Sequence, residues 1–154
     1  MPSHVNRLAW ACVGLAALAS GCQDYNWQWN FQSPDQIRAL EQRAAEQRKL
    51  VFIFYKYSLN DRMHADVLAD NQVGALFQDT VNVMIDKFSA GPAYDQFMTR
   101  YGITTPPACA LVSPDGRYKV FTGYISKDRF MELVKSAKAE LKEPARPATG
   151  KAVP

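Results

Sequence analysis

The sequence has little charge imbalance and few residues suited to metal binding. Its 154 residues carry 18 lysines and arginines against 15 aspartates and glutamates, a formal net charge of +3. The basic residues are interspersed rather than clustered, which excludes the basic stripe of a nucleic-acid-binding protein. His64 is the only histidine beyond the N-terminal segment, and with scattered carboxylates it falls short of a metal site. We therefore predict no nucleic-acid partner, no metal and no cofactor.

Long hydrophobic runs are also missing. The longest apolar stretch, residues 8–19, has 12 residues. It would extend about 18 Å as a helix, short of the roughly 30 Å hydrocarbon core of a bilayer. Because Arg7 precedes it, the stretch is typical of a signal-peptide core rather than of a membrane span.

The residues that end this run, Leu18-Ala19-Ser20-Gly21-Cys22, resemble the processing site of bacterial lipoproteins. The resemblance implies that residues 1–21 are a signal peptide and that the Cys22 thiol is acylated. Two or three acyl chains would anchor the protein stably in the cell membrane or outer membrane, facing the periplasm or the cell exterior. An ordinary secretory signal with an incidental cysteine is the alternative.

Cysteine becomes scarce once this processing is considered. Cys12 leaves with the signal peptide and Cys22 carries lipid, so Cys109 is the last of the three cysteines. The mature chain therefore has no internal disulfide to form, although its predicted compartment would permit one.

What the sequence does have is an alternation of strand-like and helix-like segments. Residues 25–31 alternate aromatic with polar side chains, which predicts a half-buried strand, with contact to the membrane interface as the alternative. Apolar runs rich in β-branched and aromatic residues predict buried strands. The predicted strands cover 25–31, 50–55, 80–85, 108–112 and 118–121, and the predicted helices cover 35–49, 59–77 in two segments, 94–101 and 127–141.

This order of elements predicts a single α/β domain. The domain would cover 27–142, after a tether over 22–26, and a tail over 143–154 rich in proline and alanine is expected to be disordered. The turn Ser113-Pro114-Asp115-Gly116 predicts a hairpin between the last two strands.

Three segments, in this order, resemble the thioredoxin superfamily: residues 49–57, residues 81–86 and Tyr101-Gly102-Ile103-Thr104-Thr105-Pro106-Pro107-Ala108. The resemblance implies a thioredoxin-like three-layer fold, with a mixed central sheet and helices on both faces. It also implies a cis peptide bond before Pro107, beside a groove at Tyr57, Pro106 and Pro107 that holds an extended peptide. Two trans bonds in a plain loop are the alternative.

The positions that carry redox chemistry in that family are changed here. Ser58 and Asp61 stand where the family has the two cysteines of its Cys-x-x-Cys motif, and Phe52 stands where it has a buried carboxylate. Thiol-disulfide exchange needs a thiolate, so we expect a redox-inactive domain with no catalytic residue. Ser58 and Asp61 are instead predicted to form a capping box, and His64 is expected at the surface.

Cys109 keeps a second hypothesis open. Its place in an apolar strand favours a buried packing role, whereas its spacing from Pro107 would suit a lone reactive thiol beside the groove. The first function hypothesis is a membrane-anchored interaction or chaperone-like module that binds an unidentified envelope protein or peptide segment. A monothiol thiol-disulfide oxidoreductase using Cys109 is the alternative, and a structural spacer is a third possibility.

Overall fold

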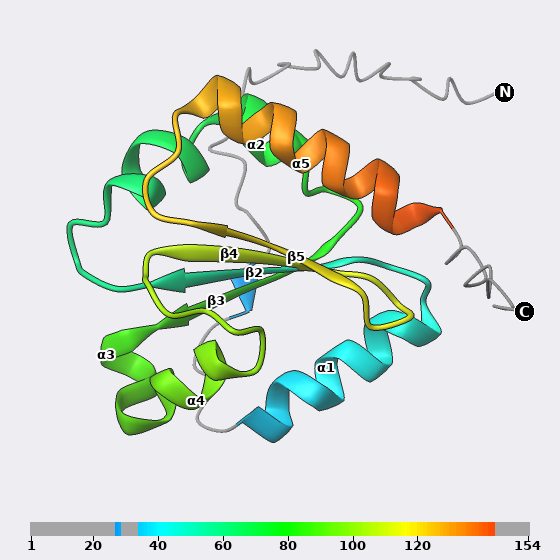
Figure 1. Cartoon of the computed structure of the whole chain (residues 1–154), viewed down its shortest axis with the longest axis horizontal. Helices are drawn as coiled ribbons and strands as arrows, with labels where there is room; N and C mark the ends of the chain where they lie inside the picture. The colour runs from blue at the N-terminus through cyan, green and yellow to red at the C-terminus, as the bar shows by residue number, and fades with distance from the viewer. Residues whose placement is uncertain (1–26, 29–33, 144–154) are drawn as a thin grey trace, which may run out of the picture.

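A five-stranded mixed sheet forms the middle layer of the computed structural model, which describes residues 27–28 and 34–143 (Figure 1). Strands β1, β3 and β2 are parallel, whereas β4 is antiparallel to both β2 and β5. The strands lie in the order β1 (Trp27–Gln28), β3 (Val81–Asp86), β2 (Val51–Lys56), β4 (Ala108–Val112) and β5 (Tyr118–Thr122). The predicted mixed sheet in an α/β domain is confirmed.

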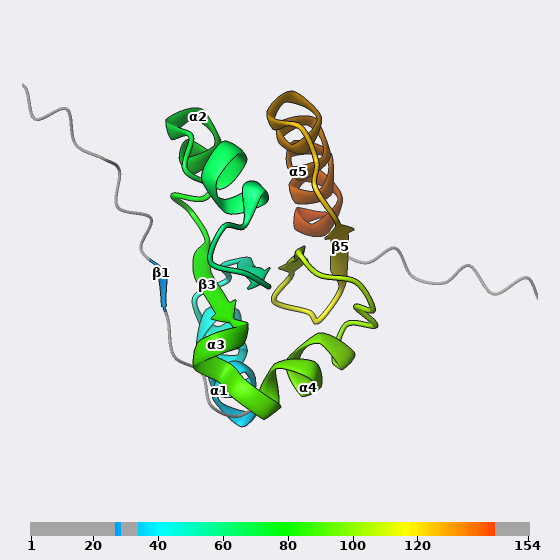
Figure 2. The ribbon, with the colours of Figure 1, turned by 90° about the vertical axis from the view of Figure 1, so that its left-hand side faces the viewer.

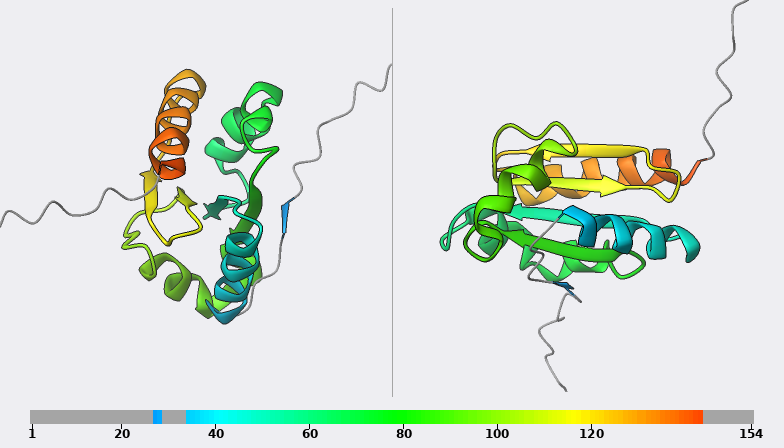
Figure 3. Two further views of the ribbon diagram at one scale, coloured as in Figure 1. Left: turned by 90° about the vertical axis from the view of Figure 1, so that its right-hand side faces the viewer. Right: turned by 90° about the horizontal axis from the view of Figure 1, so that it is seen from below.

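Helices cover both faces of the sheet (Figures 1 and 3). One face carries α1 (Pro34–Glu46), α3 (Lys87–Ala90), the 3-10 turn η2 (Gly91–Ala93) and α4 (Tyr94–Thr99). The other carries the π-helix η1 (Met63–Leu68), α2 (Asn71–Ala75) and α5 (Lys127–Lys142). No helix in the described part of the chain is long and apolar enough to cross a bilayer.

The central strand β2 shows why the core has two halves. Side chains alternate between the faces of a strand, so Val51, Ile53 and Tyr55 pack toward α1 and α4, and Phe52 and Phe54 pack toward α5. All five are buried, which contributes about 1.5–3 kcal/mol for each large apolar side chain.

The elements differ from the sequence prediction mainly at their ends. Helix α1 ends at Glu46 rather than at residue 49, because Arg48 adopts φ 54°. The Arg48 N–H then donates to the Ala45 carbonyl and the Lys49 N–H to the Ala44 carbonyl, each at 2.9 Å, the pair of bonds of a Schellman motif. Arginine thus occupies a left-handed position where glycine is the usual residue.

Other predictions fall differently. The predicted helix from residue 59 begins only at Met63 and is wound as a π-helix, and the short helix α3 was missed altogether. Of the predicted first strand, only Trp27–Gln28 lies within the described residues. The predicted signal peptide, most of the tether and the tail beyond Glu143 lie outside them.

Candidate functional site

Two loops meet at the carboxyl-terminal end of β2 (Figure 2). One follows β2 from Tyr57, and the other precedes β4 and contains a cis peptide bond between Pro106 and Pro107, as the family resemblance implied. Tyr55 pairs with Ala108 in the antiparallel ladder, so continuing the register places Tyr57 opposite Pro106. The fold therefore brings the predicted groove residues to one place, and peptide binding there stays a prediction.

Asp61 organises the loop after β2. Its side chain is 5% exposed and accepts the backbone N–H groups of Met63 at 2.9 Å, His64 at 3.3 Å and Tyr57 at 3.4 Å. The predicted capping box is wrong, because the helix begins later than expected and the capping position passes from Ser58 to Asp61. Ser58 is half-buried in the loop.

A buried ion pair lies directly beside this loop. Lys56 and Asp86 are the last register pair of the parallel strands β2 and β3, with Nζ and Oδ2 3.5 Å apart and side chains 13% and 11% exposed. Asp86 also caps α3 by accepting from the Phe88 N–H at 2.8 Å and the Ser89 N–H at 3.4 Å. The pair holds the ends of the two strands together and orients α3.

Two more titratable side chains lie under the loops. His64 is half-buried and stacks on Phe54 with ring centroids 6.0 Å apart, so its expected surface position is wrong. Burial, and then the nearby Lys56 charge, lower its pKa, which leaves the imidazole neutral at pH 7. Burial and then the Asp61 carboxylate raise the pKa of the Tyr94 hydroxyl, which has no hydrogen-bond partner among the described residues.

Exposed apolar side chains surround the two loops. β5 runs parallel to β2, since β4 is antiparallel to both, so the residue after β5 returns to this end of the sheet. Of the five large hydrophobic side chains that are exposed among the described residues, four lie here: Tyr57 at 45%, Leu59 at 75%, Phe88 at 66% and Tyr124 at 49%. We call these four residues the apolar rim.

Two cations rest on the tyrosines of the apolar rim. The Lys87 ammonium lies 4.2 Å from the Tyr57 ring centroid, and the Arg62 guanidinium lies 4.7 Å from that of Tyr124. Such cation–π contacts contribute about 0.5–1 kcal/mol at exposed sites and hold the rings in place. The rim is therefore a partly ordered surface with positive charge at its edges.

Catalytic and metal-binding groupings are not found at this end. In residues 27–28 and 34–143, no group of three or more histidine, cysteine, aspartate or glutamate side chains could hold a metal ion. Within those ranges, no hydrogen bond joins Ser58 to His64 that would make the hydroxyl a nucleophile.

Solved structures share this arrangement of strands and helices at low sequence identity. The oxidised C-terminal domain of DsbD from Neisseria meningitidis is 20% identical, with a TM-score of 0.59 over 70% of this chain and 97% of that domain. Thioredoxin f from spinach chloroplast is 13% identical, with a TM-score of 0.56 over 73% of this chain and 93% of its own. A thioredoxin from Thermus thermophilus is 15% identical, with a TM-score of 0.55 over 75% and 89%.

The chain has a thioredoxin-like fold. At these identities the likeness establishes the fold alone. No protein-family model matches the sequence, and no curated protein matches it either.

In this thioredoxin-like fold, Phe52 and Cys109 lie in the half of the core under α5. Phe52 is fully buried and stacks on Phe77 with ring centroids 3.9 Å apart. Cys109 is 1% exposed and is the free thiol of the described residues. Burial, and then the Asp61 charge, raise the pKa of that thiol, so it is uncharged at neutral pH.

Sequence reasoning missed the Lys56–Asp86 pair and Tyr94. A signal for the pair was present, because each residue follows a buried apolar run directly and parallel strands end at the same edge of a sheet. Tyr94 gave no such signal, since its helix was predicted but not the face it buries.

Proposed function

We propose that this protein is a membrane-anchored, redox-inactive thioredoxin-like protein of the cell envelope that holds a segment of a partner protein against the apolar rim. The exposed rim carries the proposal. Exposed large hydrophobic side chains scattered singly need no explanation, but four at one end of the sheet, two of them in contact with a cation, suit a protein-binding surface. Ser58 and Asp61 stand where a thioredoxin has its two thiols, so this end of the fold has no thiol pair for thiol-disulfide exchange.

The backbone beside the rim sets what a partner must supply. Neither Pro106 nor Pro107 has an N–H to donate, and the Pro107 carbonyl already accepts from Gly123 N–H at 2.7 Å. The Pro106 carbonyl is the acceptor left beside Tyr57. A bound segment would therefore donate a backbone N–H there and place apolar side chains on the rim.

The monothiol alternative has little support from the geometry. A thiol acts as a nucleophile only as the exposed thiolate, and the Cys109 thiol is buried with a raised pKa. A titration of residues 23–154 with a disulfide reagent tests this directly. Cys109 should react only after unfolding in guanidinium, and fast reaction of the native protein would restore the oxidoreductase hypothesis.

A photo-crosslinking amino acid at Leu59 tests the binding function in the cell. Leu59 is 75% exposed at the centre of the loop, and Ser136 is an exposed position on α5 for the control. We expect a discrete crosslinked species from position 59 and none from position 136. The double variant Phe88→Ser/Tyr124→Ser should weaken it, because it removes two rim side chains without touching the core.

Equal crosslinking from positions 59 and 136, or none from either, would contradict binding at the rim. The second result would favour a structural spacer. Failure of purified residues 23–154 to reduce insulin is expected in addition, and measurable reduction would overturn the redox-inactive part of the proposal.

A further inference from the structure

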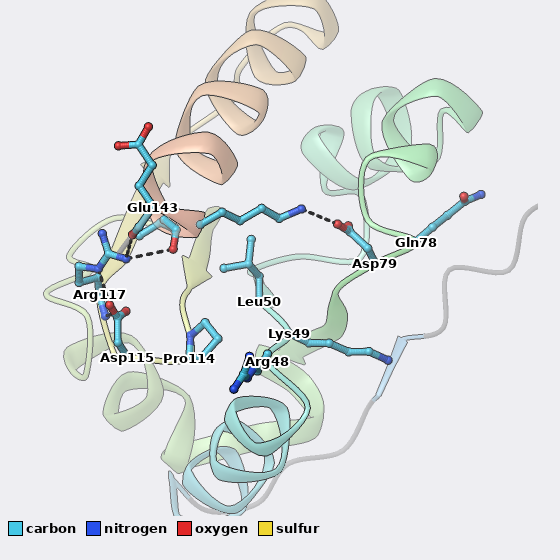
Figure 4. A pocket seen from close by; sticks show the side chains of 11 residues that line it. Arg48, Lys49, Leu50, Gln78, Asp79, Pro114, Asp115, Arg117 and Glu143 are labelled. Atoms are coloured by element: carbon cyan, nitrogen blue, oxygen red, sulfur yellow. Dashed lines mark hydrogen bonds and ion pairs between the residues drawn. The ribbon is translucent and has the colours of Figure 1, made fainter. Parts of the chain in front are cut away.

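A pocket opens at the opposite end of the sheet, where β2 begins (Figure 4). Six residues of β2 separate it from the apolar rim, about 20 Å of extended chain. Its volume is about 640 Å³, within the range of small-molecule sites. It lies between the end of α1, the segment before β3, the β4–β5 turn and the end of α5.

The inner wall of the pocket is apolar. Leu50 and Leu141 are each 4% exposed and line it together with Pro114. Between α1 and the end of α5, these side chains offer a surface for a hydrocarbon chain or ring.

Two of the pocket's three acidic side chains, Asp79 and Asp115, are already paired with cations within the protein. Asp79 binds Lys138 and, at 2.9 Å, Lys142, and these hydrogen bonds outweigh burial to lower its pKa. Asp115 accepts from Ser113 and from Arg117 at 2.8 Å, and its pKa is lowered as well. Neither carboxylate is left to attract a cation.

The Arg117 side chain also binds groups within the protein. Its guanidinium donates to the carbonyls of Glu140, Leu141 and Glu143 at 3.2, 3.1 and 2.5 Å, which satisfies the carboxyl-terminal end of α5. Figure 4 shows the Glu143 carboxylate pointing away from Leu50 and Pro114.

Arg48 and Lys49 are the cationic side chains of the pocket lining that pair with no acidic group among the described residues. Figure 4 shows Lys49 extending away from Leu50 and Pro114, which leaves Arg48 beside the apolar wall. The Arg48 backbone holds a left-handed conformation that costs an L-residue about 1–2 kcal/mol and that glycine would adopt freely. Anion binding by the guanidinium would explain why an exposed arginine, rather than a glycine, occupies this left-handed position beside an apolar wall.

We propose that this pocket binds an amphipathic anion, a molecule with a phosphate or carboxylate head and an apolar chain, with its head at Arg48 and its chain against Leu50 and Leu141. Guanidinium groups suit both heads, since they donate two parallel hydrogen bonds to planar or tetrahedral oxyanions.

The path of the chain points to the membrane surface as the source of such a molecule. Trp27 pairs with Asn82 at the start of β3, so the chain enters the sheet at the same end as the pocket. Cys22 lies five residues earlier, at most about 18 Å of chain. This step alone rests on the proposed lipid anchor, and it places the pocket within reach of the membrane surface.

Binding is tested on residues 23–154, which contain every described residue, by calorimetry below the critical micelle concentration. Decyl phosphate and decanoate are the probes and distinguish the two heads, and decyltrimethylammonium is the control of opposite charge. We expect at least one anion to bind and the cation to bind at least tenfold more weakly. Methyl resonances of Leu50 and Leu141 should shift, and side-chain resonances of Tyr57 and Tyr124 should not.

Arg48→Gly is the deciding variant, because it removes the guanidinium while relieving the backbone. Affinity should fall about tenfold, the value of one charge-assisted contact, without loss of thermal stability. Arg43→Gln, which removes the same charge from an exposed position of α1 outside the pocket, should leave affinity within twofold.

Three results would overturn the proposal. They are unchanged affinity in Arg48→Gly, equal binding of the cationic probe, and binding that appears only when the chain is cut back to residues 23–143. The last would mean that the segment after Glu143 is the occupant. Each can occur whether or not the apolar rim binds a partner.

Discussion

At the scale of single residues, Asp61 shows how a position can lose one role and take another. A carboxylate cannot replace a resolving thiol, but it can accept the backbone donors that begin a helix. Here the buried Asp61 carboxylate accepts two of them, from Met63 and His64, and also the Tyr57 N–H at the start of the loop. These hydrogen bonds hold the loop between β2 and η1 in one conformation.

Replacing Asp61 by alanine should lower the free energy of unfolding by about 1–2 kcal/mol, because the Met63 and His64 N–H groups lose their acceptor. Asp66→Ala is the matched control, since Asp66 makes only an exposed pair with Arg62 at 3.3 Å and should change stability by less than about 0.5 kcal/mol. Urea denaturation measures both. Equal losses of stability in the two variants would show that the Asp61 hydrogen bonds stabilise the fold no more than the exposed Asp66 pair does.

At the scale of elements, the end of α1 is the clearest departure from the rules of helix formation. The Schellman bonds form although arginine, not glycine, occupies the left-handed position. Stability is given up at this one turn, and nothing in the packing of α1 requires it.

The same substitution should therefore change stability in opposite directions within α1 and just beyond its end. Arg48→Gly should raise the free energy of unfolding by about 0.5–1 kcal/mol, because a left-handed strain is relieved at some cost in chain entropy. Arg43→Gly, inside the helix, should lower it by about 1 kcal/mol. Thermal denaturation of both variants gives the signs, and a loss of stability in Arg48→Gly would contradict the strain argument.

Periodicity and composition were enough to predict most elements of the described domain, but not α3 or the start of η1. Strands β2, β3 and β4 could be predicted because each is buried on both faces and is therefore a nearly continuous apolar run in the sequence. The capping role of Asp61 could not be read, since it depends on where η1 starts, and that start is set by Met63 and Val67 packing under α5. The pocket at the start of β2 is lined by residues from four separate segments, so no local sequence pattern predicts it.

At the scale of the whole molecule, charged contacts reinforce the junction between α5 and the segment before β3, which Phe77 and Phe130 also join in the core. Asp79, before β3, binds Lys138 and Lys142 of α5. These hydrogen bonds lower the pKa of Asp79 below its usual 3.8, although burial alone would raise it.

Stability should fall in acid for this reason. A carboxylate whose pKa is lowered by folding contributes its full stabilisation above its unfolded pKa and loses it as pH falls through the folded value. The free energy of unfolding of residues 23–154 should therefore drop below about pH 4, and less steeply in Lys138→Gln/Lys142→Gln than in Lys135→Gln. Parallel pH profiles for both variants would contradict the contribution of Asp79.

The lipid anchor is a prediction about the whole chain that a single residue tests. A clickable palmitate analogue fed to cells should label the full-length protein and Cys12→Ser, but not Cys22→Ser. Label that persists in Cys22→Ser would contradict acylation at that cysteine.

The short strand β1 has a consequence for how the protein can be observed. All three tryptophans, Trp10, Trp27 and Trp29, lie within the first 29 residues of the chain. Two residue pairs attach β1 to the edge of β3, so it should detach before the rest unfolds. In residues 23–154, tryptophan fluorescence should change at a lower urea concentration than the far-ultraviolet circular dichroism signal, and each optical signal would then report on a different part of the molecule.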